Sequence, residues 1–138
     1  MKRLSILFLL FLTVSCSSTK ETASNSGELD GDWYPIRQEM NGQELPLASF
    51  ENQKMAIIGN SFLFMAESAD EGNVTYSNGK MDIYVDVGVN AGRHFKSIYK
   101  YENELLTICY DLKGGDYPET FDTSKNPNLF MSTFRRQQ

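Results

Sequence analysis

The sequence of 138 residues is poor in the side chains on which metal sites and many hydrolytic sites depend. It has one histidine and two cysteines, which excludes a His-rich or Cys-rich metal site. Basic residues are outnumbered as well, with 13 lysines and arginines against 18 aspartates and glutamates and a formal net charge of -5. Because a nucleic-acid-binding protein needs a basic face, this balance argues against that class.

Long hydrophobic runs are scarce too, and the clearest one lies near the N-terminus. Lys2 and Arg3 precede an apolar stretch over residues 4–12, which is shorter than the roughly 20 residues that a membrane-spanning helix needs. A positive start followed by a short apolar run is typical of a secretory signal peptide. We therefore predict a signal peptide over residues 1–15.

The small residues Val14 and Ser15 before Cys16 resemble the lipobox of bacterial lipoproteins, although Thr13 stands where leucine is usual. The resemblance implies that Cys16 carries the lipid anchor and becomes the new N-terminus. The alternative is ordinary signal cleavage beside an unmodified cysteine. Ser17 follows Cys16, and by resemblance to enterobacterial sorting rules this favours the outer membrane, with the protein facing the periplasm. Cleavage would also remove two basic residues and lower the net charge from -5 to -7.

Residues 16–28 contain no large apolar side chain and are rich in Ser, Thr, Glu and Asn, which predicts a flexible tether. The rest of the chain, 29–138, is expected to form one domain. A hydrophobic content of 41% with 12% aromatics is enough for a packed core.

Turn signals such as Asn41-Gly42 and Asn78-Gly79 recur through this domain at a spacing typical of an all-β protein. Between the turns we predict eight strands, at 32–40, 54–59, 61–67, 72–77, 80–88, 93–101, 104–111 and 128–136. One short helix is expected near 47–53. Sequential strands joined mostly by hairpins predict an eight-stranded antiparallel up-and-down barrel, which leaves no exposed edges. Such a barrel either fills with side chains or holds one small ligand.

Gly31-Asp32-Trp33 at the start of the first strand resembles the Gly-x-Trp signature of lipocalins. The resemblance implies that Trp33 closes the bottom of the barrel and that an arginine from the last strand packs over its indole. Arg135 and Arg136 lie in the corresponding place. An arginine over a tryptophan face is a cation–π contact worth about 0.5–2 kcal/mol.

The domain also resembles a narrower group of uncharacterised lipocalin-like bacterial domains that are abundant in planctomycetes. The matching motifs are Gly31-Asp32-Trp33, Asn41-Gly42, Leu45-Pro46, Leu106-Thr107-Ile108-Cys109-Tyr110, Gly114-Gly115, Pro118-Glu119-Thr120-Phe121 and the closing strand from Leu129 to Arg136. The order Glu119-Thr120 departs from the pattern of the group. The resemblance covers about 110 of the 138 residues and implies a fold without catalytic residues.

Candidate catalytic groups are few. A Ser-His-acid triad would have to use His94, which follows a turn without a nucleophile elbow and is expected to be an exposed residue at the start of a strand. Asp82 and Asp86 lie four residues apart on one strand and hence roughly 13 Å apart, whereas paired glycosidase carboxylates lie about 5–10 Å apart. The segment 70–73 lacks the ligand pattern of a calcium loop. We therefore expect no enzyme, no metal and no cofactor.

The aromatic residues Phe62, Phe64, Phe95 and Tyr99 are candidates for a binding site inside the barrel, with a plain filled core as the alternative. The long loop 112–127 carries Tyr117 and Glu119, which would suit a protein or cationic partner, and a merely packed loop is the alternative. Cys109 is expected to be a small buried hydrophobe on a strand.

Together these features lead to the hypothesis of a monomeric, non-enzymatic, lipid-anchored envelope module. It would bind a small apolar ligand inside the barrel or a protein partner on its acidic surface. The alternative is a periplasmic immunity or inhibitor lipoprotein that neutralises a toxin or a hydrolase, since negative charge speeds capture of a basic enzyme. A cryptic hydrolase is a third class.

Overall fold

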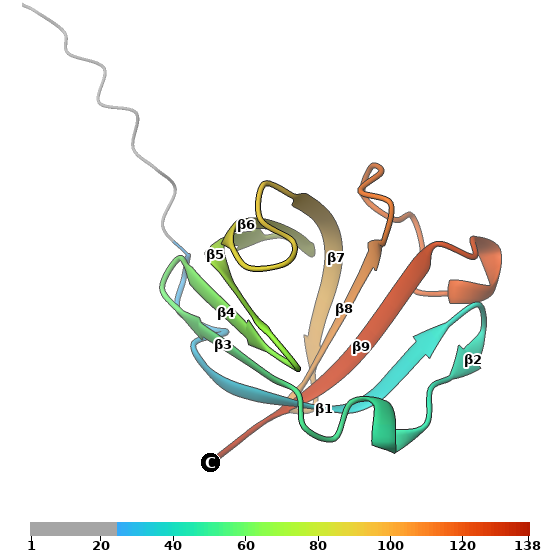
Figure 1. Cartoon of the computed structure of the whole chain (residues 1–138), viewed down its shortest axis with the longest axis horizontal. Helices are drawn as coiled ribbons and strands as arrows, with labels where there is room; N and C mark the ends of the chain where they lie inside the picture. Colours follow the sequence, from blue (N-terminus) through green and yellow to red (C-terminus); the bar gives the residue numbers. More distant parts are fainter. Residues whose placement is uncertain (1–24) are drawn as a thin grey trace, which may run out of the picture.

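The computed structural model describes residues 25–138 and is all-β (Figure 1). The predicted signal peptide, Cys16 and the tether residues up to 24 lie outside the described residues. The strands are β1 (Gly31–Met40), β2 (Gln43–Glu44), β3 (Lys54–Ile58), β4 (Ser61–Met65), β5 (Ala69–Ser77), β6 (Lys80–Val87), β7 (His94–Glu102), β8 (Leu105–Asp111) and β9 (Leu129–Arg136).

The strands form a closed antiparallel barrel. From β3 to β9 each strand pairs with the next along the chain, and β1 pairs with both β3 and β9, which closes the barrel. The two-residue β2 pairs with β1 beside this ring of eight. The predicted eight-stranded up-and-down barrel is confirmed. Seven of the predicted strands agree with the observed ones within two residues at both ends, whereas β5 begins at Ala69 instead of residue 72.

The predicted short helix is a single 3-10 turn, η1 (Leu47–Ser49), and a second turn, η2 (Thr123–Lys125), was not predicted. Phe50 already has a φ of -140°, so the helical backbone ends there, before β3 begins at Lys54. The expected length of 47–53 was therefore too long, because residues 50–52 form turns before β3 begins.

The first strand is curved (Figure 1) and pairs with both of its neighbours in the barrel. Trp33 pairs with Met55 of β3 and also with Arg136 of β9. The register against β9 shifts between Pro35 and Arg37. Proline has no N–H to donate to a ladder and an irregularity of this kind bends the strand, so the shift helps β1 to curve around the barrel.

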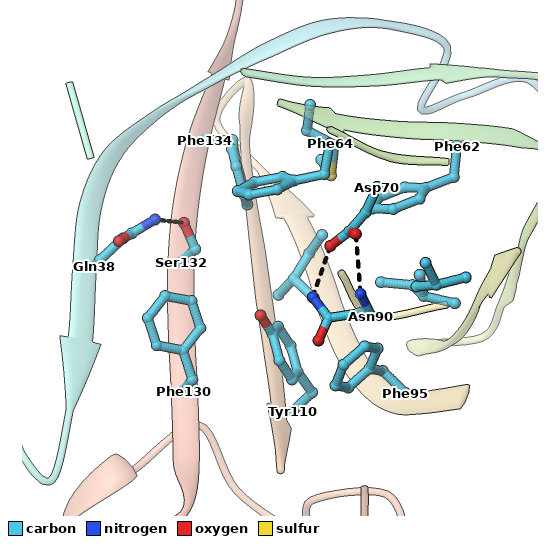
Figure 2. Close-up of a pocket in the computed structure, with 14 residues that line it drawn as sticks. Gln38, Phe62, Phe64, Asp70, Asn90, Phe95, Tyr110, Phe130, Ser132 and Phe134 are labelled. Carbon is cyan, nitrogen blue, oxygen red and sulfur yellow. Dashed lines mark hydrogen bonds between the residues drawn. The ribbon is translucent and has the colours of Figure 1, made fainter. Parts of the chain in front are cut away.

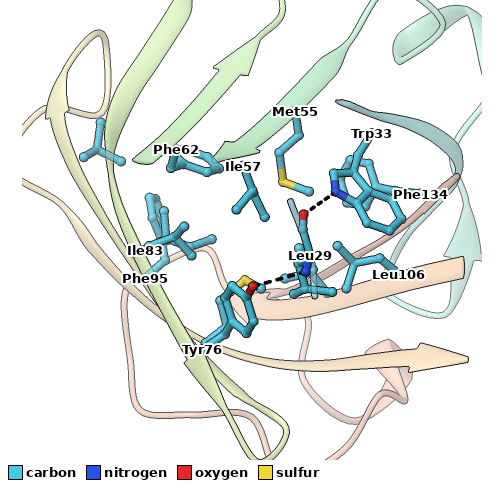
Figure 3. Close-up of a cluster of buried hydrophobic side chains, with 14 residues drawn as sticks. Leu29, Trp33, Met55, Ile57, Phe62, Tyr76, Ile83, Phe95, Leu106 and Phe134 are labelled. Carbon is cyan, nitrogen blue, oxygen red and sulfur yellow. Dashed lines mark hydrogen bonds between the residues drawn. The ribbon is translucent and has the colours of Figure 1, made fainter. Parts of the chain in front are cut away.

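One end of the barrel is closed by a hydrophobic floor (Figure 3). Trp33, Leu106 and Met81 are fully buried there, and so is Leu29, which enters from the segment before β1. The indole Nε1–H of Trp33 donates to the Leu29 carbonyl at 2.9 Å, and the Leu29 N–H donates to the Tyr76 hydroxyl at 3.1 Å. These two bonds satisfy polar groups that would otherwise be costly to bury.

The residues just before the floor are also attached to the barrel. The Asn25 side chain donates to the carbonyls of Gly59 and Val74, both at 2.8 Å, and accepts from the Tyr76 N–H at 2.9 Å. Residues 25–28, assigned from the sequence to the tether, thus begin with a side chain that bridges β5 and the β3–β4 turn.

Arg136 covers the floor from outside. Its guanidinium carbon lies 4.6 Å from the centre of the Trp33 ring and 5.6 Å from that of Tyr101. The expectation that a terminal arginine packs over the indole is met by Arg136 alone. Arg135 is exposed, because neighbouring residues of a strand point to opposite sides of the sheet and Arg135 points outward.

Gly31 is required by this arrangement. Its φ is +139°, a conformation that residues with a Cβ rarely adopt, and an added Cβ would lie 3.2 Å from Arg136 Cδ. The glycine of the Gly-x-Trp motif therefore makes room for the arginine that covers the tryptophan.

Candidate functional site

A pocket of about 130 Å³ lies inside the barrel, between the floor and the β6–β7 loop (Figure 2). Its wall is dominated by aromatic rings, which are Phe62, Phe64, Phe95, Tyr110, Phe130 and Phe134. These rings come from β4, β7, β8 and β9, where alternation directs every second side chain inward. An apolar cavity of about 150 Å³ is known to hold benzene, so this pocket suits a ligand part no larger than one ring.

Five polar side chains also face the pocket, and they are Gln38, Asp70, Asn90, Tyr110 and Ser132. A few polar groups among apolar walls are the usual composition of a small-molecule site, since they orient the ligand. The Gln38 amide donates to Gln53 at 2.7 Å and to the Ser132 hydroxyl at 3.4 Å. These contacts hold Gln38, which is only 4% exposed, against the wall.

Asp70 and Asn90 form the polar centre of the pocket. The Asn90 Nδ2–H donates to Asp70 Oδ2 at 2.6 Å, and the Asn90 backbone N–H donates to Asp70 Oδ1 at 3.2 Å. The loop approaches this closely because of Gly88, whose φ is +119° and where an added Cβ would lie 2.1 Å from Asp70 Oδ1. The two hydrogen bonds from Asn90 therefore tie the loop from 88 to 93 to Asp70 of β5 (Figure 2).

The Tyr110 hydroxyl points into the same pocket and has no hydrogen-bond partner among residues 25–138 (Figure 2). Burial raises the pKa of Tyr110 to about 12, so the phenol is neutral at physiological pH. A neutral phenol can both donate and accept a hydrogen bond, and here both capacities are available to a ligand.

The structure places three of the predicted binding residues, Phe62, Phe64 and Phe95, on the pocket wall. Tyr99 does not line it. This ring packs edge-on against Tyr76 at 5.8 Å, nearer the floor. Three of the four interior candidates therefore line the pocket, and Tyr99 lies outside it.

Sequence reasoning missed the polar members, above all Asp70 and Asn90. The predicted strand began at residue 72, which left Asp70 in a turn. In the structure Asp70, Val74 and Tyr76 are buried on the inner side of β5. Their separations of four and two residues, which place all three on one face of a strand, were the available signal once the strand is extended to Ala69.

Tyr117 and Glu119 lie outside the pocket, in the loop between β8 and β9. The Tyr117 hydroxyl donates to the Asp82 carboxylate at 2.8 Å, and the bond to Asp82 is the main reason why the pKa of Tyr117 is raised to about 12. The Lys80 and Lys96 ammonium groups lie 4.8 Å and 5.6 Å from the centre of its ring. Tyr117 thus attaches the loop to the outer wall of the barrel.

His94 is the first residue of β7, and its side chain is 34% exposed. It pairs with Asp82, a contact that the sequence did not predict. Its Nε2 lies 2.7 Å from Asp82 Oδ1, and its ring stacks on Tyr84 at 4.1 Å. In the described part of the chain, no serine, threonine or cysteine is hydrogen-bonded to His94. Asp86 instead accepts from Asn73 at 2.9 Å, so Asp82 and Asp86 have separate partners.

Cys109 is fully buried, as predicted, in a second hydrophobic cluster on the outer side of the barrel. Leu129 and Met131 belong to the same cluster, and Ile98 and Phe121 pack against it. Burial raises the pKa of the Cys109 thiol to about 11. Because Phe121 lies in the loop between β8 and β9, this loop is a packed cover over β8 and β9.

No family model matches the chain, and neither the curated proteins nor the solved structures contain a match. Within residues 25–138 there is no cluster of three or more His, Cys, Asp or Glu side chains arranged to hold a metal ion. In the same part of the chain, no helix has the length and apolar character to cross a membrane.

Proposed function

We propose that this protein is a lipid-anchored, non-enzymatic envelope module that binds a small ligand with an apolar part inside its barrel. The observation that carries the proposal is the aromatic-lined pocket of about 130 Å³ above a closed floor. Membrane attachment would come from a lipid on Cys16, and the site would face the periplasm.

The pocket combines apolar rings with a few polar groups, and this combination supports ligand binding. Trp33 and Leu29 belong to the buried cluster at one end of the barrel, and Asp70 and Asn90 place polar groups on the pocket wall. The phenylalanine rings supply apolar surface, whose burial stabilises a bound ligand by about 25 cal/mol per Å². The polar groups beside them would orient the ligand.

Titration with toluene, followed by NMR of the methyl groups of Ile83, Val85 and Ile108, tests this proposal. We expect saturable shifts confined to the pocket. Val85→Phe fills the pocket and should abolish these shifts, since Val85 is 4% exposed on its wall. Val87→Phe is the matched control, because Val87 is 60% exposed on the same strand, and it should bind as the wild type does. An absence of saturable shifts in the wild-type protein would contradict the proposal.

The second candidate function is a periplasmic immunity or inhibitor protein, and it is supported by the net acidity of the chain. The residues proposed to contact a partner give it less support, since Tyr117 is engaged by Asp82 and two lysine side chains. Capture of envelope proteins and lipids on the full-length protein separates the two functions. Stoichiometric recovery of a basic toxin or hydrolase that the protein then inhibits would favour this second candidate.

A further inference from the structure

We infer that the ligand of the pocket is a small organic cation, with an ammonium group against Asp70 and an apolar ring or short chain among the aromatic side chains. This inference rests on the proposed function and names the chemical class of its ligand. Its basis is a buried carboxylate that forms no ion pair among residues 25–138 and lies in a pocket lined by six aromatic rings.

Asp70 is 8% exposed and forms no ion pair among residues 25–138. Its hydrogen bonds come only from the side chain and backbone of Asn90. Aspartates are rarely this buried unless they are paired, because transfer of a charge out of water is costly. A ligand cation in the pocket would supply the missing partner.

Arg93 is the closest basic residue along the loop, and its contacts direct it elsewhere. Its guanidinium donates to Asn90 Oδ1 at 3.3 Å and to the Leu112 carbonyl, and it lies 4.4 Å from the centre of the Phe95 ring. By holding the amide oxygen of Asn90, Arg93 turns the amide nitrogen toward Asp70. Arg93 therefore orients the Asn90 amide N–H that donates to Asp70, but it makes no direct contact with the Asp70 carboxylate.

The walls of the pocket favour the same ligand class. Six aromatic rings line it, and ring faces attract cations, most strongly when the cation is desolvated. The free Tyr110 hydroxyl can accept a second hydrogen bond from an ammonium group. An anion would instead meet the Asp70 carboxylate, and a neutral ligand would leave it without a countercharge.

The test compares three probes that share one ring and differ in charge, namely benzylamine, benzyl alcohol and benzoate. Calorimetry and NMR at neutral pH are expected to show benzylamine binding at least tenfold more tightly than benzyl alcohol, with benzoate weakest. Asp70→Asn should remove the preference for the amine. Asp86→Asn is the matched control, because Asp86 also pairs with an asparagine, Asn73, but is exposed on the outer face, and it should keep the preference.

The outcomes separate the two proposals. Equal binding of benzylamine and benzyl alcohol in the pocket overturns the cation inference and leaves the binding function intact. Failure of all three probes and of toluene to bind overturns both. Thermal unfolding monitored by circular dichroism shows whether the Asp70→Asn variant folds. If it does not fold, the comparison of the three probes on the wild-type protein still tests the preference for a cation. A preference for the amine that survives in a folded Asp70→Asn variant also refutes the role of Asp70.

Discussion

Replacement of Arg136 by methionine measures how much the cap over Trp33 stabilises the barrel. Methionine keeps an apolar stem of similar length but removes the guanidinium group, which lies 4.6 Å from the Trp33 ring and 5.6 Å from the Tyr101 ring. The substitution also removes the hydrogen bond from the guanidinium to the Glu28 carbonyl, at 2.5 Å. Arg135→Met is the matched control, since Arg135 is the exposed neighbour on the same strand.

Three contributions decide the magnitude. The cation–π contacts contribute about 0.5–2 kcal/mol, and a hydrogen bond from a charged donor contributes about 1.5–3 kcal/mol. Against these, the Arg136 Nε–H is buried and has no partner among the described residues, which costs about 1–3 kcal/mol and would be relieved in the variant. The net expectation is a loss of about 2 kcal/mol in the free energy of unfolding for Arg136→Met. A surface change such as Arg135→Met is expected to stay within about 0.5 kcal/mol.

Urea unfolding followed by tryptophan fluorescence is the suitable assay, because Trp33 is the only tryptophan and is fully buried. With an m-value of about 1–3 kcal/mol per molar urea, a loss of about 2 kcal/mol lowers the midpoint by about 1 M. If the two variants unfold at the same urea concentration, the guanidinium does not stabilise the floor, and the reasoning from the cation–π geometry is refuted.

Three further predictions concern other parts of the chain. Gly31→Ala should lower the free energy of unfolding by about 1–3 kcal/mol, because of backbone strain and the clash with Arg136. Gly59→Ala is the control for urea unfolding and should show a smaller loss, because an added Cβ there meets nothing within 4 Å. The thiol of Cys109 should resist iodoacetamide at pH 8 until the protein unfolds, because a pKa raised from 9.0 to about 11 lowers the thiolate population about 100-fold. This protection by a protonated thiol weakens as the pH rises through about 11, and alkylation of the folded protein at pH 8 as fast as in urea would contradict it. Cys16→Ser should release the protein from membranes, and a variant that still fractionates with membranes would refute lipidation.

The strand order was predictable because it depends on local patterns, and Trp33 at the closed end was expected from the resemblance to lipocalins. Asn-Gly and Gly-Asn pairs set the tight turns through positive φ angles, as at Asn78 with φ 51° and Gly59 with φ 58°. Along β6, Met81, Ile83, Val85 and Val87 alternate with other residues on one face, and the structure buries the first three and leaves Val87, at the end of the strand, 60% exposed. The motif of Gly31 and Trp33 with a terminal arginine likewise predicted the cap.

The polar half of the site was not predictable by the same means. Asp70 and Asn90 lie 20 residues apart on different elements, and their bond depends on a loop that folds back over the barrel. The pairing of His94 with Asp82 also crosses between two strands, β7 and β6, and Tyr117 joins it from a third segment. Local periodicity places a residue on a face, but it does not say which faces meet.

The sequence by itself thus determined the fold class, the turns and the strand alternation, because each follows from properties of neighbouring residues, and the resemblance of its Gly-x-Trp motif to lipocalins placed Trp33 at the closed end. Only the tertiary structure decided which of the two arginines covers Trp33, how much space the aromatic rings leave, and that a buried aspartate without an ion pair lies among them. These features depend on the curvature of β1, the extra length of β5 and the path of the loop from 88 to 93. They arise when distant strands close into a barrel, and no short segment of the chain encodes them.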